Sequence, residues 1–272
     1  MRPILLIGKG RVGTSLSSCL RERKISFIHK RGREDFLADL PKTNLVLIAV
    51  KDDAIQEIAK TIHHSRALKP GSALAHFSGA LSSKILKAKG YYAFSIHPLK
   101  SFAFPKGRCS DFQGIPFVFE GDQQTIKIAK QLIKKLGGEW VEIQGKDKIL
   151  YHTAACAASN FLVTLVSMAS DLIQKTGILE KNRRFKATHL FLIPLLKSAI
   201  ENIEKIGIPG ALTGPIERGD FSTVKKQIEA LKKRAPNLLE VYKILSLKTL
   251  SIAVQKGLSQ KEANLLKKLL KS

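Results

Sequence analysis

The chain has 272 residues, and its 46 Lys and Arg against 22 Asp and Glu give a formal net charge of +24. Hydrophobic residues make up 44%, which excludes a disordered, collagen-like or low-complexity chain. Three cysteines without a C-x-x-C pair exclude a disulfide scaffold and favour a reducing compartment. Because the first residues enter a strand-like run without a signal-peptide pattern, we expect a cytoplasmic protein.

The basic residues are spread along the whole chain, mostly on the polar faces of predicted helices. No basic run is interleaved with aromatics, and neither zinc-finger spacing nor an RNA-binding signature is present, so we expect no nucleic-acid partner. The most apolar long segment, 154–173, is interrupted by six polar residues. We therefore expect a buried helix there and no membrane partner.

Along the first half of the chain, strand-like runs alternate with helix-like runs, which is typical of βαβ units around a parallel sheet. The predicted strands are 3–7, 25–29, 45–50, 73–77, 93–97, 116–120 and 140–143. The predicted helices between them are 12–21, 53–63, 82–88 and 123–135. This pattern predicts a doubly wound Rossmann sheet over residues 1–145.

After about residue 146 the pattern changes to helical periodicity only. The predicted helices are 148–176, 181–206, 223–233, 236–256 and 259–271. Ser259 and Glu262 fit a capping box at the start of the last one. The fold class is therefore α/β plus all-α, with a helical substrate and dimerisation domain over residues 146–272.

A glycine-rich turn follows the first predicted strand and opens the first predicted helix. Gly8 allows the tight turn, Gly10 lets the backbone approach a pyrophosphate, and Gly13 allows close helix–strand packing. Arg11 and Val12 lie inside this turn. The context favours a dinucleotide-binding site over a purely structural turn.

The end of the second predicted strand indicates which dinucleotide is bound. An NAD site usually has an acidic residue there, but this chain has Lys30, Arg31 and Arg33 before the first carboxylate, Glu34. Cations at this corner suit a 2′-phosphate, although they also suit an ordinary basic surface. We therefore predict NADP(H) as the cofactor.

The third predicted strand ends in Ala49, Val50 and Lys51. Ligands of doubly wound sheets bind at the carboxyl ends of the strands, so these three residues are predicted to contact the cofactor. Asp52 or Asp53 is predicted to cap the next helix.

Several motifs recur together in one family: the glycine turn, VLIAVKDDAI, HFSGALSS, SIHPLKSF, YHTAACAASN and LTGPIERGD. With them the chain resembles a Rossmann-like branch of the 6-phosphogluconate dehydrogenase-like superfamily that has a helical C-terminal domain of formerly unknown function. That branch includes an alternative ketopantoate reductase of the pantothenate pathway, which the chain resembles in length and layout. The resemblance implies an NADPH-dependent oxidoreductase.

Reduction of a ketone needs a group that donates a proton and groups that align the carbonyl. Lys148, His152, Cys156 and Asn160 follow at intervals of four and are predicted to share one helix face. In related dehydrogenases this helix carries a catalytic Lys one or two turns before an Asn. Here His152 takes the place of that Lys if Asn160 matches an Asn two turns after it, and Cys156 takes that place if Asn160 matches an Asn one turn after it. We favour His152 as the acid and Asn160 as an aligning residue.

Two turns after predicted strands supply further polar groups. His97 resembles the active-site His of prephenate dehydrogenases and is predicted to polarise the carbonyl, with Lys100 pairing with a substrate carboxylate. Ser78 and Gly79 are predicted to bind the substrate or the nicotinamide ribose through the hydroxyl and the backbone amide. Structural roles in the turns explain His97 and Ser78 equally well.

A loop between predicted helices contains Thr213, Arg218 and Asp220. Arg218 is a candidate for binding a substrate carboxylate, and an ion pair with Asp220 is the structural alternative. His76, His97 and His152 could converge on zinc, but no H-x-x-x-H spacing accompanies them, so we predict no metal.

These patterns together predict NADPH-dependent reduction of a small 2-oxo acid, with ketopantoate as the best candidate. The alternative is a catalytically silent NADP(H)-binding sensor or interaction protein. Apolar faces at 190–196 and 238–254 predict a homodimer, although a core role explains the same residues.

Overall fold

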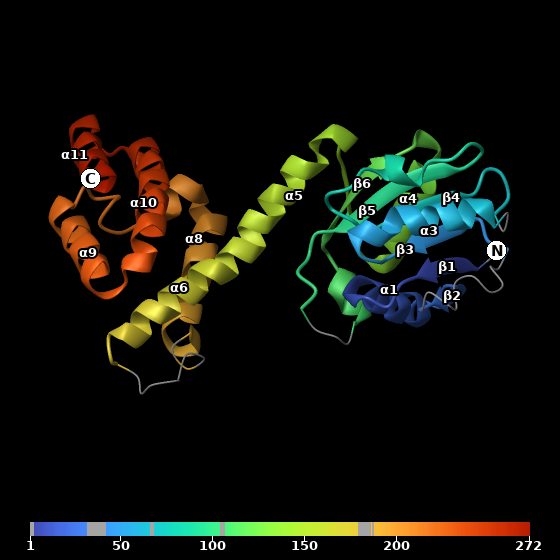
Figure 1. Ribbon diagram of the computed structural model, residues 1–272, viewed down its shortest axis with the longest axis horizontal. Helices are drawn as coiled ribbons and strands as arrows, with labels where there is room; N and C mark the ends of the chain where they lie inside the picture. Colours follow the sequence, from blue (N-terminus) through green and yellow to red (C-terminus); the bar gives the residue numbers. More distant parts are fainter. Residues whose placement is uncertain (1–2, 32–41, 66–67, 104–106, 179–185, 187) are drawn as a thin grey trace. The chain divides into compact units, whose positions relative to one another are not determined.

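The computed structural model describes residues 3–31, 42–65, 68–103, 107–178, 186 and 188–272 (Figure 1). The chain divides into two compact units, Met1–Asn160 and Phe161–Ser272. The first unit contains the sheet, and the second is helical. The fold is therefore a Rossmann-like α/β domain followed by a helical region, which confirms the predicted fold class.

The first unit is built on a seven-stranded sheet in the order β2-β1-β3-β4-β5-β6-β7. Its strands are β1 (Ile4–Ile7), β2 (Phe27–Lys30), β3 (Leu45–Ile48), β4 (Ala73–His76), β5 (Tyr92–Pro98), β6 (Pro116–Gly121) and β7 (Glu139–Glu142). All neighbours are parallel except β5 and β6. Because the chain leaves β1 first toward β2 and then toward β3, the strand order reverses beside β1, where such sheets bind ligands.

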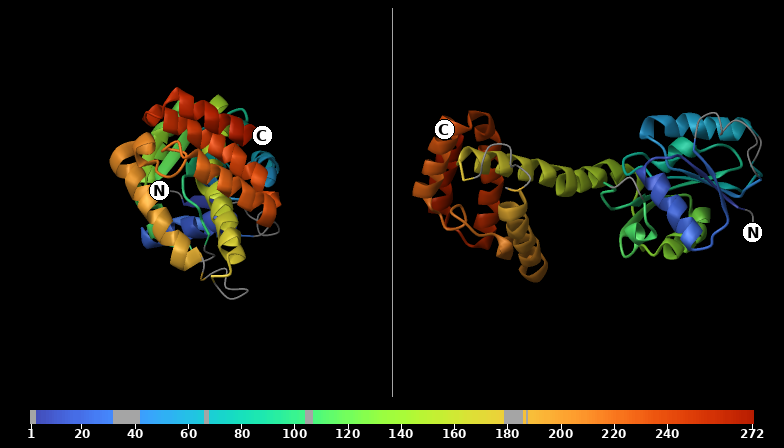
Figure 2. Two further views of the ribbon diagram at one scale, coloured as in Figure 1. Left: turned by 90° about the vertical axis from the view of Figure 1, so that its left-hand side faces the viewer. Right: turned by 90° about the horizontal axis from the view of Figure 1, so that it is seen from below.

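Helices cover both faces of this sheet. They are α1 (Arg11–Glu22), α3 (Asp52–His64) and α4 (Ile126–Leu136), with short 3₁₀ turns η1 (Ser83–Leu86), η2 (Cys109–Phe112), η3 (Gln123–Thr125) and η4 (Gly145–Asp147). The helix α5 (Lys148–Cys156) follows the last strand and η4. Figure 2 shows α3 on one face and α1 with α4 on the other.

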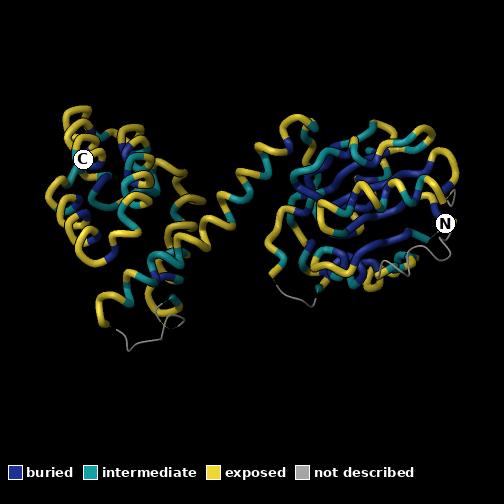
Figure 3. Tube along the Cα trace, in the orientation of Figure 1, coloured by how far each residue is buried: buried dark blue, intermediate teal, exposed yellow. Residues whose placement is uncertain are grey.

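Side chains alternate between the two faces of the sheet along each strand, so the core forms one buried cluster on each face. Leu6 and Leu47 pack with α1 and α4 in one buried cluster. Leu5 and Val46 pack with Ile55 of α3 in another. Since successive side chains of a strand point to opposite faces, the continuous apolar runs are those of a sheet buried on both sides. Figure 3 shows this burial along the strands.

A disulfide joins Cys19 of α1 to Cys109 of η2, and Cys156 is free. The two bonded cysteines lie 90 residues apart in the sequence. A disulfide framework is not expected from the sequence. The single bond forms where α1 packs against η2, and the spacing of the cysteines does not reveal that contact.

The second unit consists of helices around its own apolar cluster. After the π-helical turn η5 (Ala157–Phe161), which crosses the boundary, its elements are α6 (Leu162–Lys175), the π-helical turn η6 (Thr188–Leu192), α8 (Ile193–Ala211), α9 (Phe221–Arg234), α10 (Pro236–Lys256) and α11 (Gln260–Lys271). Val224, Leu250 and Leu266 centre the cluster formed by α9, α10 and α11. Ser259 caps α11 by accepting from the backbone N–H of Glu262, which confirms the predicted helix start.

The helical stretch Gly145–Lys175 is long and apolar enough to cross a membrane by length and composition, with a mean hydropathy of 1.5. Only 6% of its most apolar window is buried within the chain. The expectation of a buried helix at 154–173 is therefore wrong for the single chain. Phe161 and Val163 of this stretch are 58% and 70% exposed.

Candidate active site

The glycine turn lies at the carboxyl end of β1, where the strand order reverses. Gly8 has φ +117°, and a Cβ there would lie 2.1 Å from the carbonyl oxygen of Ala49. A Cβ on Gly13 would lie 2.4 Å from the carbonyl oxygen of Gly8. At Gly10 the nearest atom would be 3.8 Å away, so the backbone there is open. Two glycines thus close the turn, and the third leaves room for a ligand.

The start of α1 suits an anion. Gly10 is its N-cap and provides no capping side chain, and the first turn of α1 has no acidic residue. The first backbone N–H groups of a helix lack partners within it, and the helix dipole places partial positive charge there. Arg11 and Val12 form this first turn. A diphosphate is the group that such a turn binds.

The other residues predicted to contact the cofactor border the same edge. Ala49, Val50 and Lys51 follow β3, and Lys51 is exposed. Lys30 ends β2, and Arg31 follows it with an exposed side chain. Arg33 lies outside the described residues.

A buried lysine at the start of α5 connects that helix to β5 and to the turn that follows β4. Lys148 is 1% exposed, and its Nζ donates to the carbonyl oxygen of Ser78 at 3.0 Å and to Oγ of Ser95 at 2.6 Å. Ser95 donates in turn to Glu120, which also accepts from Ser83. A buried charge needs such partners, since an unpaired one costs several kcal/mol. Burial lowers the pKa of Lys148 to about 8, although the Glu120 and Asp52 carboxylates act to raise it.

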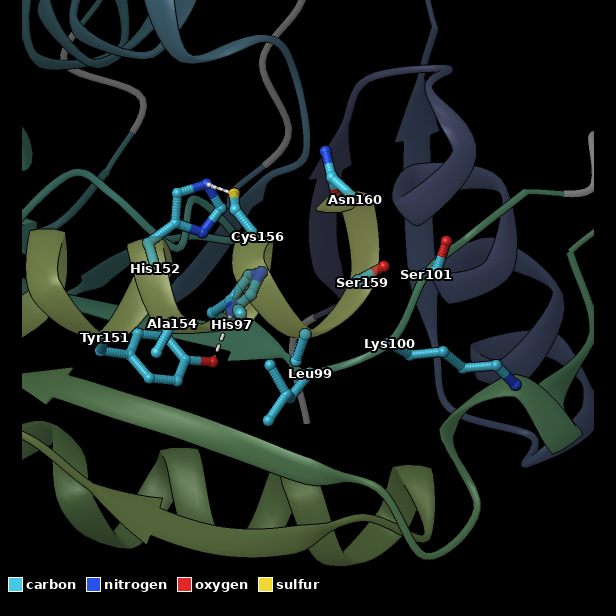
Figure 4. A pocket seen from close by; sticks show the side chains of 12 residues that line it. His97, Leu99, Lys100, Ser101, Tyr151, His152, Ala154, Cys156, Ser159 and Asn160 are labelled. Atoms are coloured by element: carbon cyan, nitrogen blue, oxygen red, sulfur yellow. Dashed lines mark hydrogen bonds between the residues drawn. The ribbon is translucent and has the colours of Figure 1, made fainter. Parts of the chain in front are cut away.

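Two histidines and a tyrosine lie close together in a second cluster (Figure 4). His97 comes from β5, and Tyr151 and His152 come from α5. Nδ1 of His97 lies 2.8 Å from the Tyr151 hydroxyl, and the His97 and His152 ring centroids are 5.7 Å apart. A Cβ on Gly79 would lie 2.6 Å from Nδ1 of His152 and 3.0 Å from Nε2 of His97. Only glycine at this turn lets both imidazoles take these positions.

The electrostatics keep His97 neutral. Burial lowers its pKa to about 4, and the charges of His152 and Lys148 act in the same direction. Burial raises the pKa of Tyr151 to about 12, so its hydroxyl stays protonated. The cluster thus holds a neutral imidazole beside a neutral phenol at neutral pH.

A pocket of about 500 Å³ opens on this cluster. It is lined by His97, Leu99, Lys100, Ser101, Tyr151, His152, Ala154, Ala155, Cys156, Ala158, Ser159 and Asn160. Five residues that the sequence suggested as site candidates therefore line the same pocket: His97, Lys100, His152, Cys156 and Asn160. The π-helical turn that contains Asn160 is a type often found at functional sites.

Other predicted substrate residues have different surroundings. The Lys100 ammonium pairs with Asp111 at 3.3 Å and points away from the His97 ring (Figure 4). The Ser78 hydroxyl donates to Asp52 at 2.7 Å and accepts from the N–H groups of Ala80 and Leu81, so it holds the turn itself. Arg218 lies in the second unit with an exposed side chain.

Neither the role of Tyr151 nor the burial of Lys148 was predicted from the sequence. The four-residue spacing selects one helix face, whereas Tyr151 reaches His97 from beside that face. Its contact joins residues 54 apart in the sequence. The sequence feature that could have identified Tyr151 is its position next to His152 on the helix that follows the sheet.

His76 is fully buried and does not join the other histidines. Its Nδ1 accepts from the N–H of Ser78 at 3.2 Å. Burial lowers its pKa to about 4, helped by the Lys148 charge. Among the described residues, no group of three or more His, Cys, Asp or Glu is placed to hold a metal ion.

Comparisons with known proteins agree with this fold. A family model described as Domain of unknown function (DUF2520) matches residues 115–249. No curated protein matches the chain. Protein TM1727 from Thermotoga maritima has a similar structure, with 26% identity and a TM-score of 0.73, over 93% of this chain and 99% of that one.

Two further structures extend the likeness. BF3122 from Bacteroides fragilis, described as a proposed NADP oxidoreductase, is 19% identical with a TM-score of 0.74, over 92% of this chain and 98% of that one. Pyrroline carboxylate reductase from Plasmodium falciparum, solved with NADP bound, is 13% identical with a TM-score of 0.59, over 97% and 98%. The chain therefore has the fold of Rossmann-type oxidoreductases.

Proposed function

We propose that the protein is an NADP(H)-dependent oxidoreductase that reduces a small 2-oxo acid. The observation that carries the proposal is the position of the His97–Tyr151–His152 pocket in the same unit as the glycine turn. The residues of that pocket follow β5 and lie on α5, and the turn follows β1. Structural neighbours that bind NADP or NADPH support the choice of cofactor.

The residues at the strand-order reversal fit a phosphorylated dinucleotide. The open backbone at Gly10 and the uncapped start of α1 would hold the diphosphate. Arg31 and Lys30 would hold the 2′-phosphate, because a guanidinium pairs with phosphate oxygens in a bidentate way. Val50 and Lys51 would border the nucleotide at the end of β3. When bound, the reduced nicotinamide supplies a hydride.

The pocket residues would supply the proton and the alignment. His152 would donate the proton that the reduced carbonyl oxygen needs. His97 would donate a hydrogen bond to that oxygen, and Asn160 would align the substrate. The alanines of α5 give the pocket an apolar wall, which suits a small branched acid. The substrate carboxylate would replace Asp111 as the ion-pair partner of Lys100.

Within this class we propose ketopantoate as the substrate, on the resemblance to the alternative ketopantoate reductases. The test is oxidation of NADPH, followed by nicotinamide absorbance, with a panel of 2-oxo acids that includes ketopantoate. Turnover of another 2-oxo acid but not ketopantoate would remove the substrate and keep the class. Tight NADPH binding without turnover of any of them would favour the silent sensor.

The acid role of His152 has its own test. We expect His152→Ala to lower kcat at least about 100-fold, the usual contribution of a general acid. The matched control is His64→Ala, which removes an exposed histidine of α3. A loss of less than about tenfold in His152→Ala would contradict the acid role.

We also propose that the protein is a homodimer. The support is the exposed apolar surface of the helical unit, where Leu195, Ile203 and Ile206 of α8 are 67%, 46% and 61% exposed. Apolar surface of this kind is stabilised when a second copy covers it.

A further inference from the structure

The hydrogen bond between Tyr151 and His97 determines what His97 can do in the pocket. The hydroxyl of Tyr151 lies 2.8 Å from Nδ1 of His97, and the two rings meet edge to face with centroids 5.7 Å apart (Figure 4). A neutral imidazole has one ring nitrogen that donates and one that accepts. The partner of Nδ1 therefore sets the role of Nε2.

The direction of this bond follows from the protonation of both groups. The phenol is protonated and the imidazole is neutral at neutral pH, as their shifted pKa values of about 12 and about 4 require. Within the described part of the chain, His97 is the hydrogen-bond partner of the Tyr151 hydroxyl. A phenol O–H is a stronger donor than a neutral imidazole N–H, and an unprotonated imidazole nitrogen is a stronger acceptor than a phenol oxygen, so the hydroxyl is the donor in this pair. Tyr151 therefore donates to Nδ1, and the His97 proton lies on Nε2.

The protonated nitrogen is the one available to a ligand. Nε2 of His97 makes no hydrogen bond to any described residue and lies beside Gly79, where a Cβ would come within 3.0 Å. His97 lines the pocket. A carbonyl oxygen in the pocket would thus meet an N–H donor, which stabilises the negative charge that develops on the oxygen during reduction.

We propose that Tyr151 is a positioning residue that fixes His97 in the Nε2-protonated tautomer, so that His97 presents an N–H donor to the carbonyl oxygen of the 2-oxo acid. The inference rests on the proposed function for its substrate, but the tautomer belongs to the protein without ligands. Tyr151 itself touches no reacting atom in this account.

The first test is ¹⁵N NMR of the histidine rings in the protein without ligands, with the His97 signals assigned from a His97→Gln variant. We expect the wild-type signals of a protonated Nε2 and an unprotonated Nδ1. In Tyr151→Phe, both nitrogens should move to intermediate shifts as the tautomers exchange. A wild-type Nδ1-protonated ring, or unchanged shifts in Tyr151→Phe, would overturn the inference.

The second test is kinetic and uses Tyr92→Phe as the control, because Tyr92 is exposed at the start of β5. Tyr151→Phe should lower kcat about 10- to 100-fold, the range of a lost donor to the transition state, with KM and NADPH affinity within about twofold. Wild-type turnover with an equally active Tyr151→Phe would refute this inference and leave the proposed function intact. Wild-type silence toward every 2-oxo acid would refute the proposed function, and the NMR result would still decide the tautomer.

Discussion

Lys148 is a buried cation whose protonation should be visible in the stability of the protein. Its pKa is lowered to about 8 from an ordinary value of 10.5, chiefly by burial. Between these values the unfolded state binds more protons than the folded state, so the free energy of unfolding rises with pH. We expect this rise between pH 8 and 9.5 in urea titrations of the wild type and its loss in Lys148→Met.

The control for this experiment is Lys146→Met, which removes an exposed lysine of the neighbouring turn η4. It should keep the wild-type slope. Equal slopes in the wild type and Lys148→Met would show that the buried ammonium is not the group that titrates.

Gly79 is the residue whose substitution tests the packing of the two imidazoles. A Cβ would lie 2.6 Å from His152 and 3.0 Å from His97, so Gly79→Ala must displace both rings. We expect kcat with the active 2-oxo acid to fall about 100-fold, since small misplacements of catalytic groups cost that much. NADPH affinity and the melting temperature should not change and serve as internal controls. An unchanged kcat would show that catalysis does not depend on these positions of the two rings.

At the level of residues, the sequence predicted part of this site. The four-residue spacing of His152, Cys156 and Asn160 placed them together, and they do line one pocket. The sequence did not predict that Asn160 would lie in a π-helical turn or that Tyr151 would form a hydrogen bond with His97. Those features depend on how α5 packs on the ends of β4 and β5, which local periodicity does not encode.

At the level of elements, substitutions in the β1–α1 turn can distinguish an effect on protein stability from an effect on NADPH binding. Gly10→Ala adds a methyl where the nearest atom is 3.8 Å away, so the melting temperature should stay within about 2 °C, as for a surface change. Its methyl would face the diphosphate, so NADPH affinity should fall at least about tenfold. Calorimetry and thermal unfolding measure the two effects.

Gly13→Ala is the contrasting variant, because its Cβ would press on the Gly8 carbonyl oxygen at 2.4 Å. It should destabilise the fold by about 1–3 kcal/mol, the usual cost of overpacking. If Gly10→Ala bound NADPH like the wild type, the turn would not be the diphosphate site.

Element positions were largely predictable because each strand is a short apolar run bounded by turn residues. All seven predicted strands are present, and the helix predicted at 236–256 has those bounds. The helix predicted at 82–88 is instead the 3₁₀ turn Ser83–Leu86, where Glu120 accepts from the N–H of Ser83. That buried carboxylate comes from β6, so a local pattern does not reveal it.

For the whole molecule, the exposed apolar helices lead to a prediction about assembly. The 30.0 kDa chain should sediment as a dimer of about 60 kDa, twice that mass. Burial of the exposed leucines against a second copy removes apolar surface from water and so stabilises the dimer. Leu195→Lys should shift the equilibrium to the monomer, whereas Lys197→Leu, at an adjacent site of α8, should not. A wild-type monomer at micromolar concentrations would contradict the dimer.

The binding of the dinucleotide by the first unit is the central claim, and calorimetry tests it most directly. We expect the wild type to bind NADPH at least about tenfold more tightly than NADH, because one charge-assisted contact to the 2′-phosphate contributes about 1.5–3 kcal/mol. Arg31→Ala should reduce that preference. Failure of the protein to bind either nucleotide would contradict the account.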